Sequence, residues 1–270
     1  MKSSPGKLAL GVVFGILFAT LLACGSAPVP LQATDTPQLV ATEVLTPTFT
    51  PIPLASVVSL VSNLTEETGQ SPNYTINAQT PFLQNSEDMR VVNFNNEMAL
   101  LTQEEIASFR DNVAQILPSP DSTGSFYDQQ YTVLSPPGNL LSLKFQIMIY
   151  IQGAAHPGTH SRTVTYDLEA GSDVRLADLF LPGSDYLERI ANYCIAQLST
   201  RDIGFEASSS GAQPLPENYG DWNITSDGLL ITFDEYQVAA YAAGPQEVIV
   251  PYAELQSVID SQGPLAGFIL

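Results

Sequence analysis

The sequence is poor in basic residues: 9 lysines and arginines stand against 28 aspartates and glutamates, giving a formal net charge of −19 at pH 7. A nucleic-acid-binding surface needs lysine and arginine to neutralise phosphates, so this composition argues against a nucleic-acid partner. It also disfavours binding to anionic lipid through a basic patch. The charge is compatible with a basic protein partner attracted by a long-range field. The simpler interpretation, which we favour, is an acidic surface that keeps a secreted protein soluble.

Cysteine is almost absent, with Cys24 and Cys194 as its two occurrences. Cys24 follows two lysines and a long apolar run, as at the end of a secretory signal. The sequence Leu21-Leu22-Ala23-Cys24-Gly25 resembles the bacterial lipobox, so we expect a signal peptide over residues 1–23 and a lipid anchor on Cys24. The alternative is an uncleaved anchor helix, because the apolar run approaches spanning length. Cys194 then has no partner for a disulfide, and we place it on the buried face of a helix.

Several patterns that accompany catalysis are missing. There is no Gly-x-Ser-x-Gly elbow, no phosphate-cradling glycine loop and no cofactor box. Paired acids such as Glu104-Glu105 and Asp234-Glu235 are adjacent, and adjacent side chains do not face one another as acid–base pairs must. We therefore expect neither catalysis nor a cofactor.

Residues 24–55 are rich in proline and threonine and carry few charges, which predicts an extended tether. We divide the rest into an N-terminal α+β half over 72–135 and a C-terminal α+β half over 136–262. The segment 54–70 is a short amphipathic possibility left undecided. A long helix is predicted from about residue 87 to 117, capped by Asn85-Ser86 and kinked near Thr102, with an apolar stripe through Phe94 and Met98 that packs on a sheet.

The later elements complete the predicted fold class. Hairpins are expected over 126–167 and 222–233, a surface loop over 204–220, and a final helix from Pro251 that buries Leu255, Val258 and Ile259. Hairpins interspersed with a few helices predict an α+β fold with antiparallel sheets and helices packed on one face.

The clearest pattern lies in residues 139–167. Apolar side chains recur there at every second position, the period of a half-buried strand, at Leu141, Leu143, Phe145, Ile147, Ile149 and Ile151. A second alternating run over 163–168 predicts an antiparallel partner strand across a loop of about nine residues. This loop contains Gly153, Pro157 and both histidines, His156 and His160.

His156 and His160 form an H-x₃-H pair. On a helix this spacing places two imidazoles on one face as zinc ligands. Pro157 between them rules against a continuous helix, and a third ligand such as Asp128 or Asp167 would have to come from elsewhere. We favour a structural role in which His156 hydrogen-bonds the loop backbone, and we expect no metal site.

The turn Tyr241-Ala242-Ala243-Gly244-Pro245 is also unusual. Its small residues allow close approach of backbone to a neighbouring strand or to a ligand, and we favour the strand. If this turn lies beside the histidine loop, the two form one recognition surface, with Trp222, Tyr236 and Tyr241 as aromatic anchors for sugar or protein. The candidate binding residues are Gly153, His156, Pro157, His160, Trp222, Tyr236, Tyr241, Gly244 and Pro245.

Several stretches together resemble the extracytoplasmic domain shared by RsiV-type lysozyme-sensing anti-sigma factors and PdaC-type peptidoglycan deacetylases. In order along the chain they are Gly153-Ala154-Ala155-His156-Pro157, Tyr166-Asp167-Leu168, Leu176-Ala177-Asp178-Leu179-Phe180, Pro182-Gly183-Ser184-Asp185-Tyr186-Leu187, Asp227-Gly228-Leu229, Tyr241-Ala242-Ala243-Gly244-Pro245 and Pro251-Tyr252-Ala253-Glu254-Leu255. Ala154 stands where the family usually has a second glycine. The resemblance covers roughly residues 72–259 and implies an α+β domain outside the membrane. We expect neither the sigma-binding segment of the anti-sigma relatives nor the metal-dependent catalytic domain of the deacetylases.

The sequence therefore predicts a non-catalytic binding module, lipid-anchored at the bacterial cell envelope and facing outside the cytoplasmic membrane. Its expected partner is a basic lysozyme-like protein or peptidoglycan. One alternative is a cell-wall hydrolase or deacetylase that uses the loop of His156 and His160. Another is a structural envelope lipoprotein.

Overall fold

The computed structural model describes residues 53–117, 124–134 and 139–266, all within one unit that spans residues 50–270. The expected signal peptide over 1–23, the lipidation site Cys24 and nearly all of the expected tether lie outside the described residues. Within the described ranges, no helix is long and apolar enough to cross a membrane.

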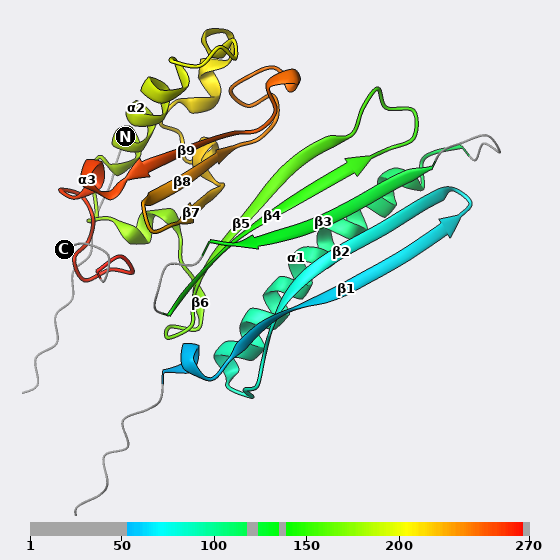
Figure 1. The fold of residues 1–270 in the computed structure, drawn as a ribbon, viewed down its shortest axis with the longest axis horizontal. Helices are drawn as coiled ribbons and strands as arrows, with labels where there is room; N and C mark the ends of the chain where they lie inside the picture. Colours follow the sequence, from blue (N-terminus) through cyan, green and yellow to red (C-terminus); the bar gives the residue numbers. More distant parts are fainter. Residues whose placement is uncertain (1–52, 118–123, 135–138, 267–270) are drawn as a thin grey trace, which may run out of the picture. The chain divides into compact units, whose positions relative to one another are not determined.

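The first of two sheets has six strands in sequence order (Figure 1). They are β1 (Ser59–Gln70), β2 (Asn73–Gln84), β3 (Ser125–Val133), β4 (Leu140–Tyr150), β5 (Gly158–Asp167) and β6 (Ser172–Asp173). All neighbours pair antiparallel except β2 and β3, which are parallel because helix α1 (Met89–Val113) carries the chain back between them. The segment 54–70 forms a short 3-10 helix over Leu54–Ser56 followed by β1.

The second sheet is antiparallel and has three strands, β7 (Trp222–Ile224), β8 (Gly228–Phe233) and β9 (Gln246–Pro251). Two helices accompany it, α2 (Tyr186–Leu198) and α3 (Tyr252–Leu255). Further 3-10 helices span Leu176–Leu179, Phe205–Ala212, Pro216–Tyr219 and Tyr241–Ala243. The predicted α+β class is confirmed. The boundary expected at residues 135–136 falls between β3 and β4, inside the six-stranded sheet, and the division into halves stays a prediction.

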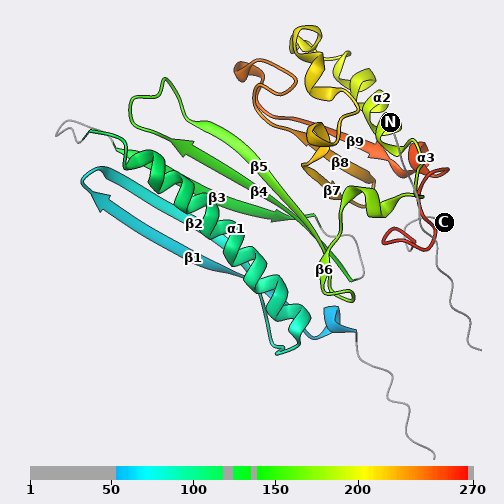
Figure 2. The same ribbon diagram turned by 180° about the vertical axis from the view of Figure 1, so that it is seen from behind.

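Helix α1 lies across one face of the six-stranded sheet (Figure 2). Its predicted apolar stripe is buried, with Phe94 and Met98 at 0% exposure. The same core contains the alternating residues of β4, Leu143, Phe145 and Ile147. The helix ends at Val113, earlier than predicted, and the turn that follows places Ile116 against the same core.

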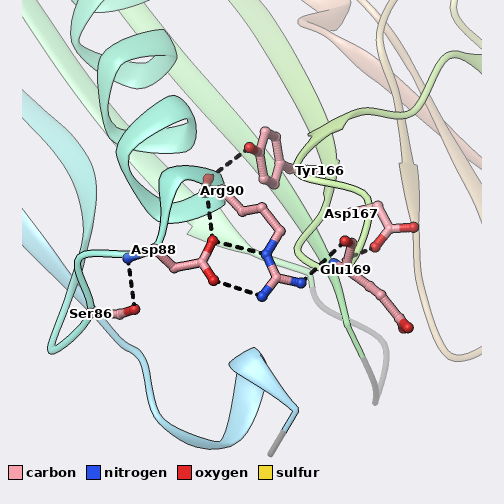
Figure 3. A network of polar contacts seen from close by, with 6 residues as sticks. All are labelled: Ser86, Asp88, Arg90, Tyr166, Asp167 and Glu169. Atoms are coloured by element: carbon pink, nitrogen blue, oxygen red, sulfur yellow. Dashed lines mark hydrogen bonds and ion pairs between the residues drawn. The ribbon is translucent and has the colours of Figure 1, made fainter. Parts of the chain in front are cut away.

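The start of α1 is joined to the β5–β6 turn by one arginine (Figure 3). Asp88, rather than the predicted Asn85-Ser86, is the N-cap, and its carboxylate accepts from Arg90 N at 2.9 Å. The Arg90 guanidinium pairs with Asp88 at 2.8 Å and donates to Glu169 O at 3.2 Å. Tyr166 OH donates to Arg90 O at 2.8 Å. The strand end and the helix start are thus fixed to each other.

The second core lies between α2 and the three-stranded sheet. The α2 residues Ile190, Cys194 and Leu198 are all 0% exposed and belong to the same cluster as Leu229 and Ile231 of β8, so Cys194 lies on the buried helix face as predicted. Two expectations for this region were wrong. The segment 204–220 is a pair of 3-10 helices with buried side chains, and α3 ends at residue 255, after which an extended bridge forms between residues 180 and 259.

The two sheets meet through polar side chains. Asn223 on β7 donates to Ser142 Oγ at 2.9 Å and to Leu143 O at 3.0 Å, both on β4. Trp222 N donates to Thr163 Oγ1 on β5 at 3.0 Å. Because buried polar groups need specific partners, this contact fixes the register of one sheet on the other.

Candidate binding site

The loop between β4 and β5 carries one histidine, not two. His156 lies in the loop and is exposed, and its Nδ1 donates to Pro157 O at 2.8 Å, as predicted. His160 instead lies on β5, which begins at Gly158. Gly153 turns the loop with φ +93°, a conformation that a side chain would strain. The loop is therefore shorter than expected.

Two tyrosines from the connection between β8 and β9 lie beside His156. The rings of His156 and Tyr241 stack, with centroids 3.7 Å apart and planes at 24°. Tyr241 OH donates to Pro157 O at 2.9 Å, and the ring of Tyr236 lies 5.7 Å from that of Tyr241. In the neutral imidazole whose Nδ1 donates, Nε2 is the acceptor, and it lies 3.3 Å from Tyr236 OH. We call His156, Tyr236 and Tyr241 the aromatic ledge.

Two carboxylates hold the Tyr236 turn against the edge of β5. Asp234 Oδ1 accepts from Ser161 N at 2.9 Å, and Glu235 Oε2 accepts from Thr159 N at 3.1 Å. Edge strands present unpaired N–H groups, and these carboxylates satisfy two of them. The adjacent Tyr236 is 61% exposed and has φ +68°, which is costly for a bulky residue. An exposed ring buries little apolar surface, and a positive φ costs free energy, so stability of the fold does not explain a tyrosine at this position.

His160 faces helix α1 and takes no part in the ledge. Its Nε2 lies 3.2 Å from Glu105 Oε2, and Arg162 Nε lies 2.8 Å from Glu105 Oε1. The hydrogen bond from His160, followed by that from Arg162, lowers the pKa of Glu105 to about 2 despite its partial burial. The candidate role of His160 in binding therefore gives way to a link between β5 and α1. In the described part of the chain, no group of three or more His, Cys, Asp or Glu side chains is arranged to hold a metal ion.

Trp222 is not an exposed anchor. It is 7% exposed on β7, a strand whose three residues are all buried, and it packs in the second core. It also lines a cavity of about 370 Å³ beside Tyr186 and Tyr219. The expectation that it joins Tyr236 and Tyr241 is wrong because the short strand is covered on both faces.

Gly244 and Pro245 continue from the ledge into a second cavity. Gly244 has φ +66°, and its N–H donates to Tyr241 O at 2.9 Å. Pro245 lines a cavity of about 320 Å³ between the two sheets. Its other walls come from β3, β4, β5, β8 and β9 and from the residue that follows β3: Thr132, Leu134, Lys144, Gln146, Thr159, Ser161, Leu230 and Glu247.

No activated nucleophile accompanies the ledge in the described ranges. Cys194 is fully buried, and burial raises the pKa of its thiol to about 12. Burial, together with the nearby Asp234, raises the pKa of the Asp221 carboxyl to about 6. Its side chain contacts Thr163 Oγ1 at 3.4 Å rather than His156. The arrangement offers ring faces and hydrogen-bonding groups for a ligand.

Sequence reasoning missed two sets of residues. Asp234 and Glu235 were dismissed as an adjacent acidic pair, yet both cap the β5 edge. Lys144 and Gln146 occupy the polar positions of β4, which alternation alone assigns to solvent. No local signal reveals a second sheet covering that face.

Comparison with known proteins assigns part of the chain to a family. Residues 177–253 match the family described as "Protein of unknown function (DUF3298)". This matched segment covers less than half of the chain. It contains Tyr236, Tyr241, Gly244 and Pro245, so the tyrosines of the ledge belong to the DUF3298 segment, whereas His156 precedes it.

Two curated relatives extend the match. The chain is 22% identical to the peptidoglycan-N-acetylmuramic acid deacetylase PdaC of Bacillus subtilis over 197 residues, or 72% of this chain and 40% of that protein. It is 28% identical to the esterase Rv3036c of Mycobacterium tuberculosis over 144 residues, or 52% of this chain and 62% of that protein. The resemblance to the PdaC-like domain family is confirmed. The chain spans less than two thirds of either relative.

Solved DUF3298 structures share the fold. A family member from Bacteroides fragilis superposes with a TM-score of 0.59 at 18% identity, covering 78% of this chain and 97% of that one. A family member from Pseudomonas aeruginosa gives a TM-score of 0.56 at 16% identity, covering 75% of this chain and 94% of that one. At these identities the likeness concerns the fold alone.

Proposed function

We propose that the protein is a non-catalytic binding module of the bacterial cell envelope, outside the cytoplasmic membrane, and that the aromatic ledge recognises peptidoglycan. The observation that carries this proposal is Tyr236, an aromatic residue at 61% exposure with a left-handed backbone, beside the stacked His156 and Tyr241. Exposed aromatic faces bind sugar rings and protein side chains well. Strain at an exposed residue points to function more than to stability.

The comparisons support the setting of this proposal. PdaC is named for action on peptidoglycan, and the DUF3298 segment is the part of the chain that supplies both tyrosines. Cys24 belongs to the proposal as the lipid anchor that keeps the domain at the membrane. The acidic charge of −19 makes a basic lysozyme-like protein the rival partner.

The hydrolase or deacetylase alternative draws on the names of the two relatives, a deacetylase and an esterase. The surroundings of His156 argue against this alternative. Its ring nitrogens contact a backbone carbonyl and a tyrosine hydroxyl, and no hydrogen bond in the described ranges joins it to serine, cysteine or carboxylate. A general base needs such a partner or a substrate proton within reach.

The test compares two histidine variants of the full chain, His156→Ala and His160→Ala. Binding to purified peptidoglycan and to a basic lysozyme is measured at low salt and at ~0.5 M salt, where screening removes nonspecific attraction. We expect salt-resistant peptidoglycan binding that His156→Ala weakens and His160→Ala retains, because only His156 belongs to the ledge.

Other outcomes contradict parts of the proposal. Salt-resistant binding of lysozyme alone would replace peptidoglycan with a basic protein as the partner. Release of acetate or sugar fragments that stops in His156→Ala would establish the enzyme alternative. Loss of all binding at high salt would remove the ledge as a recognition surface and leave a structural envelope role.

A further inference from the structure

Two chain segments connect the aromatic ledge with the cavity of about 320 Å³. From His156 the chain runs directly to Thr159, and from Tyr241 it runs directly to Pro245. Both Thr159 and Pro245 line the cavity. The cavity lining therefore begins three residues after His156 on one segment and four residues after Tyr241 on the other.

The cavity carries no unpaired charge among its lining residues. Lys144 of β4 and Glu247 of β9 both line it and form an ion pair with each other. Its remaining polar groups are uncharged hydroxyls and an amide, from Thr132, Gln146 and Ser161 together with Thr159. An anion or cation would compete with an existing ion pair, so the walls favour a neutral ligand with hydroxyl and amide groups.

Apolar groups complete the walls. Leu230 and Pro245 give the cavity surfaces for C–H groups. Thr232 lies two residues from Leu230 and opposite Glu247 in register, so its side chain shares their face of the sheet. It is 1% exposed, and its Oγ1 has no hydrogen-bond partner within the described ranges. Apolar patches among uncharged donors and acceptors are the surroundings that a sugar ring requires.

We propose that this cavity binds an N-acetylated sugar unit of a glycan strand whose neighbouring unit lies on the aromatic ledge. The volume of about 320 Å³ lies at the small end of the range for ligand sites, roughly 300–1,000 Å³, which suits a single ring. The exposed Gln146 amide hydrogen-bonds the acetamido group or a ring hydroxyl. This inference rests on the proposed function, since it names the ligand and a second subsite.

The experiment measures binding of a trimer of N-acetylglucosamine to the full chain by calorimetry and by saturation-transfer NMR. The test variant is Gln146→Leu, which keeps size and removes the amide at an exposed position. The matched control is Gln130→Leu, because Gln130 lies opposite Gln146 in register on β3 and is also exposed but does not line the cavity. Thermal unfolding verifies that both variants fold.

We expect the trimer to bind with its acetyl methyl saturated by the protein, Gln146→Leu to weaken the affinity about tenfold, and Gln130→Leu to change it less than twofold. Equal effects of the two variants, or none, would overturn the cavity assignment. Binding of intact peptidoglycan without binding of the trimer would overturn this inference while sparing the proposed function. If neither the trimer nor intact peptidoglycan binds, both this inference and the proposed function are overturned.

Discussion

The ring of His156 stacks on the ring of Tyr241 with centroids 3.7 Å apart, although His156 lies in a loop of the six-stranded sheet and Tyr241 in the connection between β8 and β9 of the other sheet. Tyr241 OH also donates to the carbonyl of Pro157, the residue after His156. This pair joins the β4–β5 loop to the turn before β9. The ledge therefore depends on connections from both sheets. Because its residues lie outside both hydrophobic cores, they can be substituted without disturbing either core.

Tyr236→Gly is expected to separate stability from binding. Glycine adopts φ +68° without the steric cost that tyrosine carries, so the variant should be as stable as the parent or up to about 1 kcal/mol more stable. Peptidoglycan binding should fall, because the exposed ring is gone. Urea unfolding and a pull-down measure the two effects. Tyr236→Ala is the control: it loses the ring but keeps the strain, so a stability equal to that of Tyr236→Gly would contradict the argument.

Glu105→Gln should weaken the link between β5 and α1 without affecting the ledge. The Glu105 carboxylate pairs with both His160 and Arg162. Because these groups are partly exposed, we expect a loss of about 1 kcal/mol in the free energy of unfolding at pH 7. The folded-state pKa of Glu105 is lowered from 4.5 to about 2, so this stabilisation is present above pH 4.5 and disappears as the pH falls to about 2. Unfolding curves of parent and variant should converge there; a difference that persists at pH 2 would contradict the assignment.

Glu97 on α1 should make stability fall with rising pH. Burial, followed by its hydrogen bond with Asp173, raises the pKa of Glu97 from 4.5 to about 8. The folded state then binds a proton that the unfolded state releases, so the stabilisation is complete below pH 4.5 and is lost by about pH 8. Glu97→Gln should flatten this part of the stability profile. A slope in Glu97→Gln equal to that of the parent would contradict this assignment.

Trp222→Ala should be among the most destabilising changes in the second core. Trp222 is 7% exposed and packs with the β7–β9 sheet, so removing its ring should cost about 3–5 kcal/mol. Chemical denaturation measures this loss. Under conditions where the variant is still folded, ledge binding should match the parent. A specific loss of binding at unchanged stability would restore Trp222 as a ligand contact.

Periodicity predicted much of the fold. Alternation at Leu143, Phe145 and Ile147 placed a strand with one buried face, and the stripe through Phe94 and Met98 placed the helix that covers it. These signals are local: a pleated strand and a helix each repeat their buried positions at a fixed interval. Element ends were less predictable: α1 ends at Val113 although Ile116 beyond it still packs against the core, and Asp88 rather than Ser86 caps its start. The parallel pairing of β2 with β3 also leaves no local signal.

The sequence by itself determined the acidic charge, the absence of a disulfide framework, the alternating strands and the residues that could form a ledge. Only the tertiary structure decided which of those residues meet. His156 joins Tyr236 and Tyr241, while His160, four positions on, turns to Glu105 on α1 and Trp222 enters the core. The reason is that His156 lies in the loop before β5 whereas His160 lies on the strand, and what covers each side of a sheet comes from distant parts of the chain. A spacing along the sequence therefore cannot specify which side chains will share a site.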